Sequence, residues 1–148
     1  MPPDKRGKFK EIKDKISRYF SAKPEIKVGY IFGSAAKGAE HKLSDIDIAI
    51  LVDAEKLPGD ASYKYKAGVI ADIIGILKNT KVDLVILNES PLFLCFNVIK
   101  DGVILYSNDE MGRIQFEARI MSLYFDQEYY YKRHAKATID RIATEGIL

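Results

Sequence analysis

Residues 26–52 read IKVGYIFGSAAKGAEHKLSDIDIAILV, in which two apolar segments flank a polar connector. The first segment, Ile26–Phe32, is rich in β-branched and aromatic residues and stops at Gly33. The second, Ile46–Val52, is almost continuously apolar. Both patterns are typical of β-strands, and the second is typical of a strand buried on both faces. We therefore expect two neighbouring strands joined by a short connector.

The first half of the connector has the composition of an anion site. Gly33 ends the first strand, and Ser34 opens a short turn that contains Lys37 and that Gly38 can end. Backbone N–H groups and the Ser34 hydroxyl would then point at one spot near a helix N-terminus, where negative charge is favoured. The sequence predicts a phosphate site at Gly33, Ser34, Lys37 and Gly38.

Acidic residues stand at the heads of two strands. Asp45 and Asp47 are two residues apart, so the period of a strand places both side chains on one face. Asp83 occupies a similar place in a third apolar strand, Val82–Leu87. If the first two strands are antiparallel and the third is parallel to the second, the three carboxylates meet at one edge of the sheet. Like charges this close are tolerated mainly when a divalent cation lies between them or one stays protonated, so we predict a metal site there.

The rest of the chain completes an α/β (α+β) pattern. Apolar residues at helical spacing predict a helix over about Asp4–Ser21 and a second over Tyr63–Leu77. Further on we expect a short helix from Pro91 to about Lys100 and a brief strand at Val103–Tyr106. A long C-terminal helix follows over about residues 109–145. We interpret residues 1–148 as one domain with a core at about 8–108.

Composition restricts the class of protein. Hydrophobic residues make up 47% and charged residues 30% of the 148 residues, a balance typical of globular proteins. The apolar run Ile46–Val52 is interrupted by Asp47 and is far shorter than the ~20 residues of a membrane-spanning helix. The first residues do not resemble a secretory signal, and the single Cys95 cannot form a disulfide framework. We therefore expect a cytoplasmic protein without a membrane segment.

Several features allow a structural as well as a functional interpretation. The net charge of +2 is too small to indicate a nucleic-acid surface. His41 and His134 lack the spacing of a zinc site, and Cys95 fits a small core residue better than a nucleophile. The aromatic residues near Tyr129–Tyr131 fit either an ordinary helix or an interface, with the same chain or with another, through the C-terminal helix.

The pattern Gly33-Ser34, ten residues, then Asp45-x-Asp47 resembles the signature of the DNA polymerase β-like nucleotidyltransferase superfamily, and the short chain resembles its minimal nucleotidyltransferase branch. The resemblance covers about residues 8–110. It implies a small mixed sheet flanked by helices, with Gly33 and Ser34 holding a triphosphate and Asp45 and Asp47 binding two Mg²⁺ ions. Asp83 would complete one metal site and help to activate the attacking hydroxyl.

The same resemblance implies a function. Minimal members are often encoded beside a HEPN ribonuclease toxin and act as antitoxins that transfer AMP from ATP to a toxin tyrosine, so nucleic acid would be involved only indirectly. Lys37 stands where many relatives have Arg. It keeps the positive charge but cannot form the two parallel hydrogen bonds to a phosphate that a guanidinium forms. Two alternatives stay open: an antitoxin that neutralises its partner by covering it, and an enzyme that modifies a small hydroxyl compound such as an aminoglycoside.

Overall fold

The computed structural model describes residues 5–33, 45–57, 62–79 and 81–146. Within these ranges it contains a four-stranded sheet with the order β3-β2-β1-β4. The strands are β1 (Ile26–Phe32), β2 (Ile46–Val52), β3 (Val82–Ile86) and β4 (Val103–Ser107). Strand β1 is antiparallel to both β2 and β4, whereas β3 is parallel to β2. The pairing directions expected for the first three strands are confirmed.

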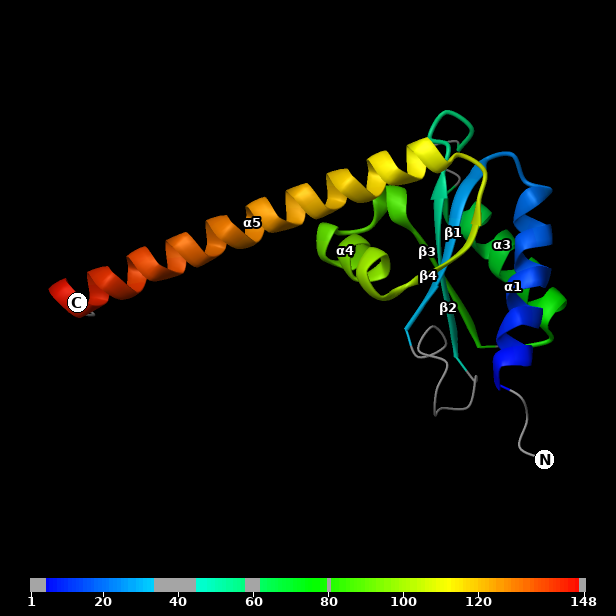
Figure 1. Cartoon of the computed structure of the whole chain (residues 1–148), viewed down its shortest axis with the longest axis horizontal. Helices are drawn as coiled ribbons and strands as arrows, with labels where there is room; N and C mark the ends of the chain where they lie inside the picture. The colour runs from blue at the N-terminus through cyan, green and yellow to red at the C-terminus, as the bar shows by residue number, and fades with distance from the viewer. Residues whose placement is uncertain (1–4, 34–44, 58–61, 80, 147–148) are drawn as a thin grey trace.

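Helices cover both faces of this sheet. They are α1 (Lys5–Ser21), α3 (Ser62–Leu77), α4 (Leu92–Asp101) and α5 (Glu110–Glu145), with a short 3-10 helix, η2, at Leu87–Glu89. Figure 1 shows α1 and α3 on one face, and α4 with the first part of α5 on the other. The predicted class, a small mixed sheet flanked by helices with a long C-terminal helix, is confirmed. None of the described helices is both long and apolar enough to cross a membrane.

Strand β2 contributes side chains to two separate cores. Ile46, Ile48 and Ile50 pack in the cluster that includes residues of α1 and α3. Ala49 faces the other way and packs with Tyr30 and residues of α4. Since both faces of the strand are covered, both require apolar residues, which explains why the sequence of β2 is almost continuously apolar.

Strand β3 is one residue shorter than the sequence predicted, because Leu87 begins η2. The ladder between β2 and β3 ends at Ile50 and Ile86. Beyond the ladder, the side chain of Asn88 makes the two backbone hydrogen bonds that a neighbouring strand would make with Val52. Its Oδ1 accepts from the Val52 N–H at 2.9 Å, and its Nδ2 donates to the Val52 carbonyl at 2.7 Å. A side-chain amide thereby satisfies the end of β2, and the strand pairing stops there.

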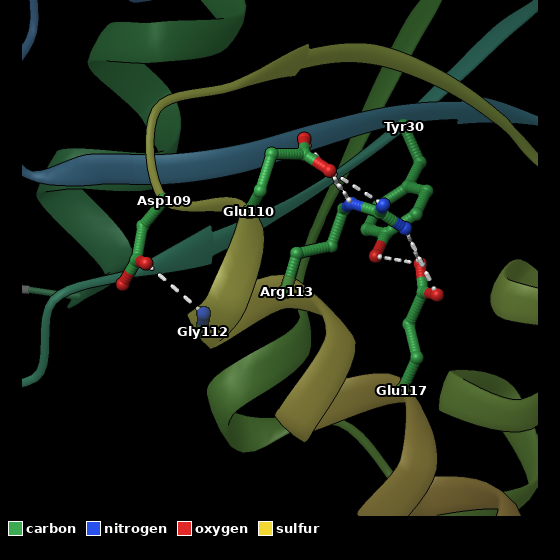
Figure 2. Close-up of polar contacts among 6 residues, drawn as sticks. All are labelled: Tyr30, Asp109, Glu110, Gly112, Arg113 and Glu117. Atoms are coloured by element: carbon green, nitrogen blue, oxygen red, sulfur yellow. Dashed lines mark hydrogen bonds and ion pairs between the residues drawn. The ribbon is translucent and has the colours of Figure 1, made fainter.

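The start of α5 is fixed to the sheet by a group of polar contacts (Figure 2). The Asp109 carboxylate caps the helix by accepting from the Gly112 N–H at 3.0 Å. Arg113 bridges Glu110 and Glu117, with N···O distances of 2.7 and 3.0 Å. The hydroxyl of Tyr30, on β1, donates to Glu117 Oε1 at 2.8 Å. Because Tyr30 is only 1% exposed, this bond sets the position of α5 against the sheet interior.

The C-terminal half of α5 leaves the sheet and projects away from it (Figure 1). Its contacts with α4 include aromatic ones: the Phe96 and Tyr124 rings stack with centroids 3.7 Å apart. From Tyr129 to Glu145 every residue is exposed, and we call this segment the α5 overhang. The overhang carries apolar side chains that no other described element covers.

Replacing Tyr30 by Phe should destabilise the fold. The substitution removes a hydrogen bond to a charged group while leaving the ring in place, so we expect the free energy of unfolding to fall by roughly 1.5 kcal/mol. Urea unfolding followed by circular dichroism measures it. The matched control is Tyr63→Phe, whose side chain is 82% exposed and whose removal of a hydroxyl should cost less than about 0.5 kcal/mol. Equal effects of the two substitutions would contradict this role of Tyr30.

Candidate active site

The end of β1 and the starts of β2 and β3 lie at the same end of the sheet (Figure 1). The register across these strands aligns three positions: Asp47 is paired with Phe32 on one side and with Asp83 on the other. Asp45 precedes β2 directly and therefore projects from the same face as Asp47. The strand pairing thus brings together the three acidic residues that the sequence singled out.

These carboxylates share one cavity. It has a volume of about 320 Å³ and is lined by Asp45, Asp47, Lys81, Val82 and Asp83. Asp45 and Asp83 are exposed to solvent, whereas Asp47 is half-buried. Ala49, two residues beyond Asp47, packs toward α4, so the acids occupy the α4 side of the sheet edge.

The electrostatics of the cavity act most strongly on its most buried acid. Burial first, and then the negative charges of Asp83 and Asp45, raise the pKa of the Asp47 carboxyl. All three causes oppose the ionised form, which is the form that binds a cation. A positive charge placed in this cavity would therefore be favoured by the carboxylates that surround it.

Gly33 supplies a second feature of the site. Its φ of 72° lies in the left-handed region that glycine adopts without strain. A Cβ atom at this position would lie 2.5 Å from Asp47 Oδ2, so a larger residue would collide with the carboxylate. The strand end and the acidic cavity are therefore in direct contact. Ser34, Lys37 and Gly38, predicted with Gly33 to bind phosphate, lie outside the described residues, as does His41.

The donor set fits a hard divalent cation, because carboxylate oxygens are the protein ligands that Mg²⁺ prefers. The ligands are not already arranged for a metal ion. Within the described ranges, no three Asp, Glu, His or Cys side chains lie close enough together to hold one. One reason lies at Asp83, whose Oδ1 accepts from the N–H of Leu84 at 2.9 Å. One oxygen of this carboxylate is therefore already engaged by the backbone, although its charge still acts on Asp47.

Lys81 is a cavity residue that sequence reasoning missed. The signal was present, since Lys81 stands two residues before Asp83 and so projects from the same side of the strand. The other candidates behave as structural residues. Cys95 is buried, which raises the pKa of its thiol, and His134 lies in the exposed overhang with its ring against Tyr130.

The raised pKa of Asp47 predicts that Asp47→Asn stabilises the metal-free protein at neutral pH. A carboxyl with a higher pKa in the folded state favours folding below the unfolded-state value of about 3.9, and this contribution is lost as pH rises through the folded-state pKa. The gain from Asp47→Asn should therefore be present at pH 7 and shrink toward pH 4, as measured by urea unfolding in EDTA. Asp126→Asn, on exposed α5, is the control and should show no such gain. Loss of stability in Asp47→Asn at pH 7 would contradict the assignment.

Comparison with known proteins agrees with this geometry. Residues 14–111 match the family model described as polymerase beta, nucleotidyltransferase. The protein adenylyltransferase MntA of Shewanella oneidensis is 31% identical over 101 residues, which are 68% of each chain. The protein adenylyltransferase MntA of Aphanizomenon flos-aquae is 31% identical over 118 residues, 76% of this chain and 79% of that one.

Solved structures give the same result. A chain from the complex of tri-AMPylated Shewanella oneidensis HEPN toxin with MNT antitoxin is 25% identical, with a TM-score of 0.62 over 91% of this chain and 98% of that chain. A chain from a toxin–antitoxin structure with AMP-PNP is 27% identical, with a TM-score of 0.60 over 88% and 98%. The resemblance inferred from Gly33-Ser34 and Asp45-x-Asp47 is thereby confirmed. The chain belongs to the polymerase β nucleotidyltransferase family, in the branch that contains the protein adenylyltransferases MntA.

Proposed function

We propose that this chain is an antitoxin that transfers AMP from ATP to a tyrosine hydroxyl of a HEPN toxin. The observation that carries the proposal is the cavity shared by Asp45, Asp47 and Asp83 beside Gly33, in a chain of this family. Two relatives are named protein adenylyltransferases, and two similar solved structures contain an AMPylated HEPN toxin or AMP-PNP, which supports a HEPN toxin as the acceptor and an adenine nucleotide as the donor. With ATP as the proposed substrate, the proposal also includes a cytoplasmic location.

Each site residue has a distinct role in this proposal. Gly33, Ser34, Lys37 and Gly38 hold the triphosphate through backbone N–H groups, a hydroxyl and an ammonium. Asp45 and Asp47 would hold two Mg²⁺ ions, and Asp83 would complete one of the two sites. When bound, Mg²⁺ would neutralise phosphate oxygens and polarise the α-phosphate.

The proposed reaction is an in-line displacement at the α-phosphorus. The acceptor oxygen forms a bond to that phosphorus, and the bond from the phosphorus to the oxygen that bridges to the β-phosphate breaks. Pyrophosphate leaves with the electron pair, and the hydroxyl proton passes to Asp83. The protein contributes mainly by positioning the groups and by matching their charges.

The α5 overhang is the surface that we assign to the toxin. Tyr131, Ile139 and Ile142 are 62%, 64% and 41% exposed, and the spacing of Tyr131 and Ile142 continues the side of α5 on which Ile120 is buried. A cavity of about 360 Å³ at the base of the overhang is lined in part by Phe93 and Tyr131. An apolar stripe next to an aromatic-lined cavity is typical of a protein-binding surface.

The same surface favours the second candidate function, in which the chain neutralises its partner by covering it. Binding through α5 needs none of the acidic residues. The two functions therefore differ in what the carboxylates do, and one variant at the cavity and one on the overhang separate them.

Asp47→Asn should abolish transfer of labelled AMP from ATP to the toxin that co-purifies with the chain. Loss of a metal ligand removes several kcal/mol of transition-state stabilisation, so we expect the rate to fall by roughly 1,000-fold or more. Mass spectrometry of the toxin measures the reaction as the gain of one or more AMP groups. Asp126→Asn serves as the control that changes the same chemical group on exposed α5.

Two outcomes separate the candidates. Undiminished labelling by Asp47→Asn would refute the proposed catalytic role. If Asp47→Asn still silences the toxin without labelling it, while Ile139→Glu on the overhang fails to bind the toxin, the chain acts by covering its partner. The proposed enzyme predicts that toxin activity returns in Asp47→Asn.

A further inference from the structure

Lys81 is held at the mouth of the acidic cavity by backbone contacts. Its carbonyl accepts from the Ile46 N–H at 2.9 Å, and its own N–H donates to Asn79 Oδ1 at 2.9 Å. These bonds fix the residue directly ahead of β3 and beside the start of β2. Because Lys81 precedes Asp83 by two residues, both project from the same side of the strand. Lys81 lines the cavity together with the three acidic residues.

The charge of Lys81 is available to a ligand. Of the described residues that line the cavity, it is the cationic one, and its side chain is exposed. Continuing the register from Ile46 and Val82 places Asp45 opposite Lys81. The ion pairs formed among the described residues nevertheless do not include Lys81. Its ammonium is therefore not held by a carboxylate of the described residues.

The strand order places Lys81 away from the proposed triphosphate. Gly33 follows β1, Asp45 and Asp47 belong to β2, and Lys81 precedes β3, so the acids lie between Gly33 and Lys81. With strands spaced ~4.8 Å apart, the two ends of this row are about 10 Å from each other. In an in-line displacement the attacking oxygen enters opposite the leaving group. If pyrophosphate leaves on the Gly33 side, the acceptor enters on the β3 side.

We propose that Lys81 is a catalytic residue for the acceptor: its ammonium contacts the attacking oxygen and favours hydroxyls that become anionic readily, such as a tyrosine phenol. This inference rests on the proposed function and specifies the acceptor side of that same site. Lys81 donates a hydrogen bond and keeps its protons. The acceptor proton passes to Asp83, the oxygen–phosphorus bond forms, and pyrophosphate leaves with its electron pair.

The test compares Lys81→Met, Lys81→Arg and the wild type in transfer to the co-purifying toxin. Met removes the charge and keeps much of the length, and loss of one charge-assisted hydrogen bond should lower kcat/KM for the toxin roughly 10- to 100-fold. Arg should restore most of it. The affinity for AMP-PNP, measured directly by titration, should stay within about twofold of the wild type. Lys64→Met, on exposed α3, removes the same charge elsewhere and should match the wild type.

Three results would overturn the inference. Weaker AMP-PNP binding by Lys81→Met with unchanged toxin kinetics would assign the residue to the triphosphate side. Full activity of Lys81→Met, with circular dichroism showing a folded chain, would remove it from the reaction. If Lys81→Met does not fold, Lys81→Gln provides the same comparison. Labelling by the wild type distinguishes these failures from failure of the proposed function, because absent labelling overturns both.

Discussion

The alignment of Phe32, Asp47 and Asp83 across β1, β2 and β3 is the constraint on which the site depends. Side chains alternate along a strand, so a shift of one residue in either pairing would turn a carboxylate to the opposite face of the sheet. The register therefore fixes which acids share the cavity. It also brings Gly33 against Asp47, because β1 ends where β2 begins. The charge cluster is thus a consequence of backbone pairing, although its own electrostatics oppose it.

Packing on both faces of the sheet holds that register. The isoleucines of β2 are anchored against α1 and α3, while Ala49 and Tyr30 pack toward α4 and α5. A one-residue shift in register would turn the isoleucines of β2 away from α1 and α3 and bury Asp47 among apolar side chains. This burial costs far more free energy than the repulsion between partly solvated carboxylates. The polar contacts of Arg113 with Glu110 and Glu117 add a fixed start for α5. The stability of the core thereby maintains an arrangement of like charges that would not form alone.

Hydrophobic periodicity was sufficient to predict most elements. The predicted bounds of β1 and β2 agree with the structure because Glu25 and Gly33 flank the first strand and Asp45 and Asp53 flank the second. The predicted end of β3 was wrong. The contact between Asn88 and Val52 joins residues that are far apart in the sequence, so no local sequence pattern indicates it. The meeting of Asp45, Asp47 and Asp83 at one sheet edge could be predicted from the two-residue period and the strand pairing, whereas their roles stay predictions. Lys81 was missed because an exposed lysine before a strand is common. Ser34, Lys37 and Gly38 stay predictions.

The central claim is that the three acids together bind divalent ions around the nucleotide. Crystals of the chain grown with Mn²⁺ and AMP-PNP would test it directly by anomalous scattering, which locates the ions without reference to activity. The account predicts ions bound by Asp45 and Asp47, with Asp83 as a ligand of one of them. Ions bound elsewhere, or at the same place in a chain with all three acids replaced by Asn, would contradict it.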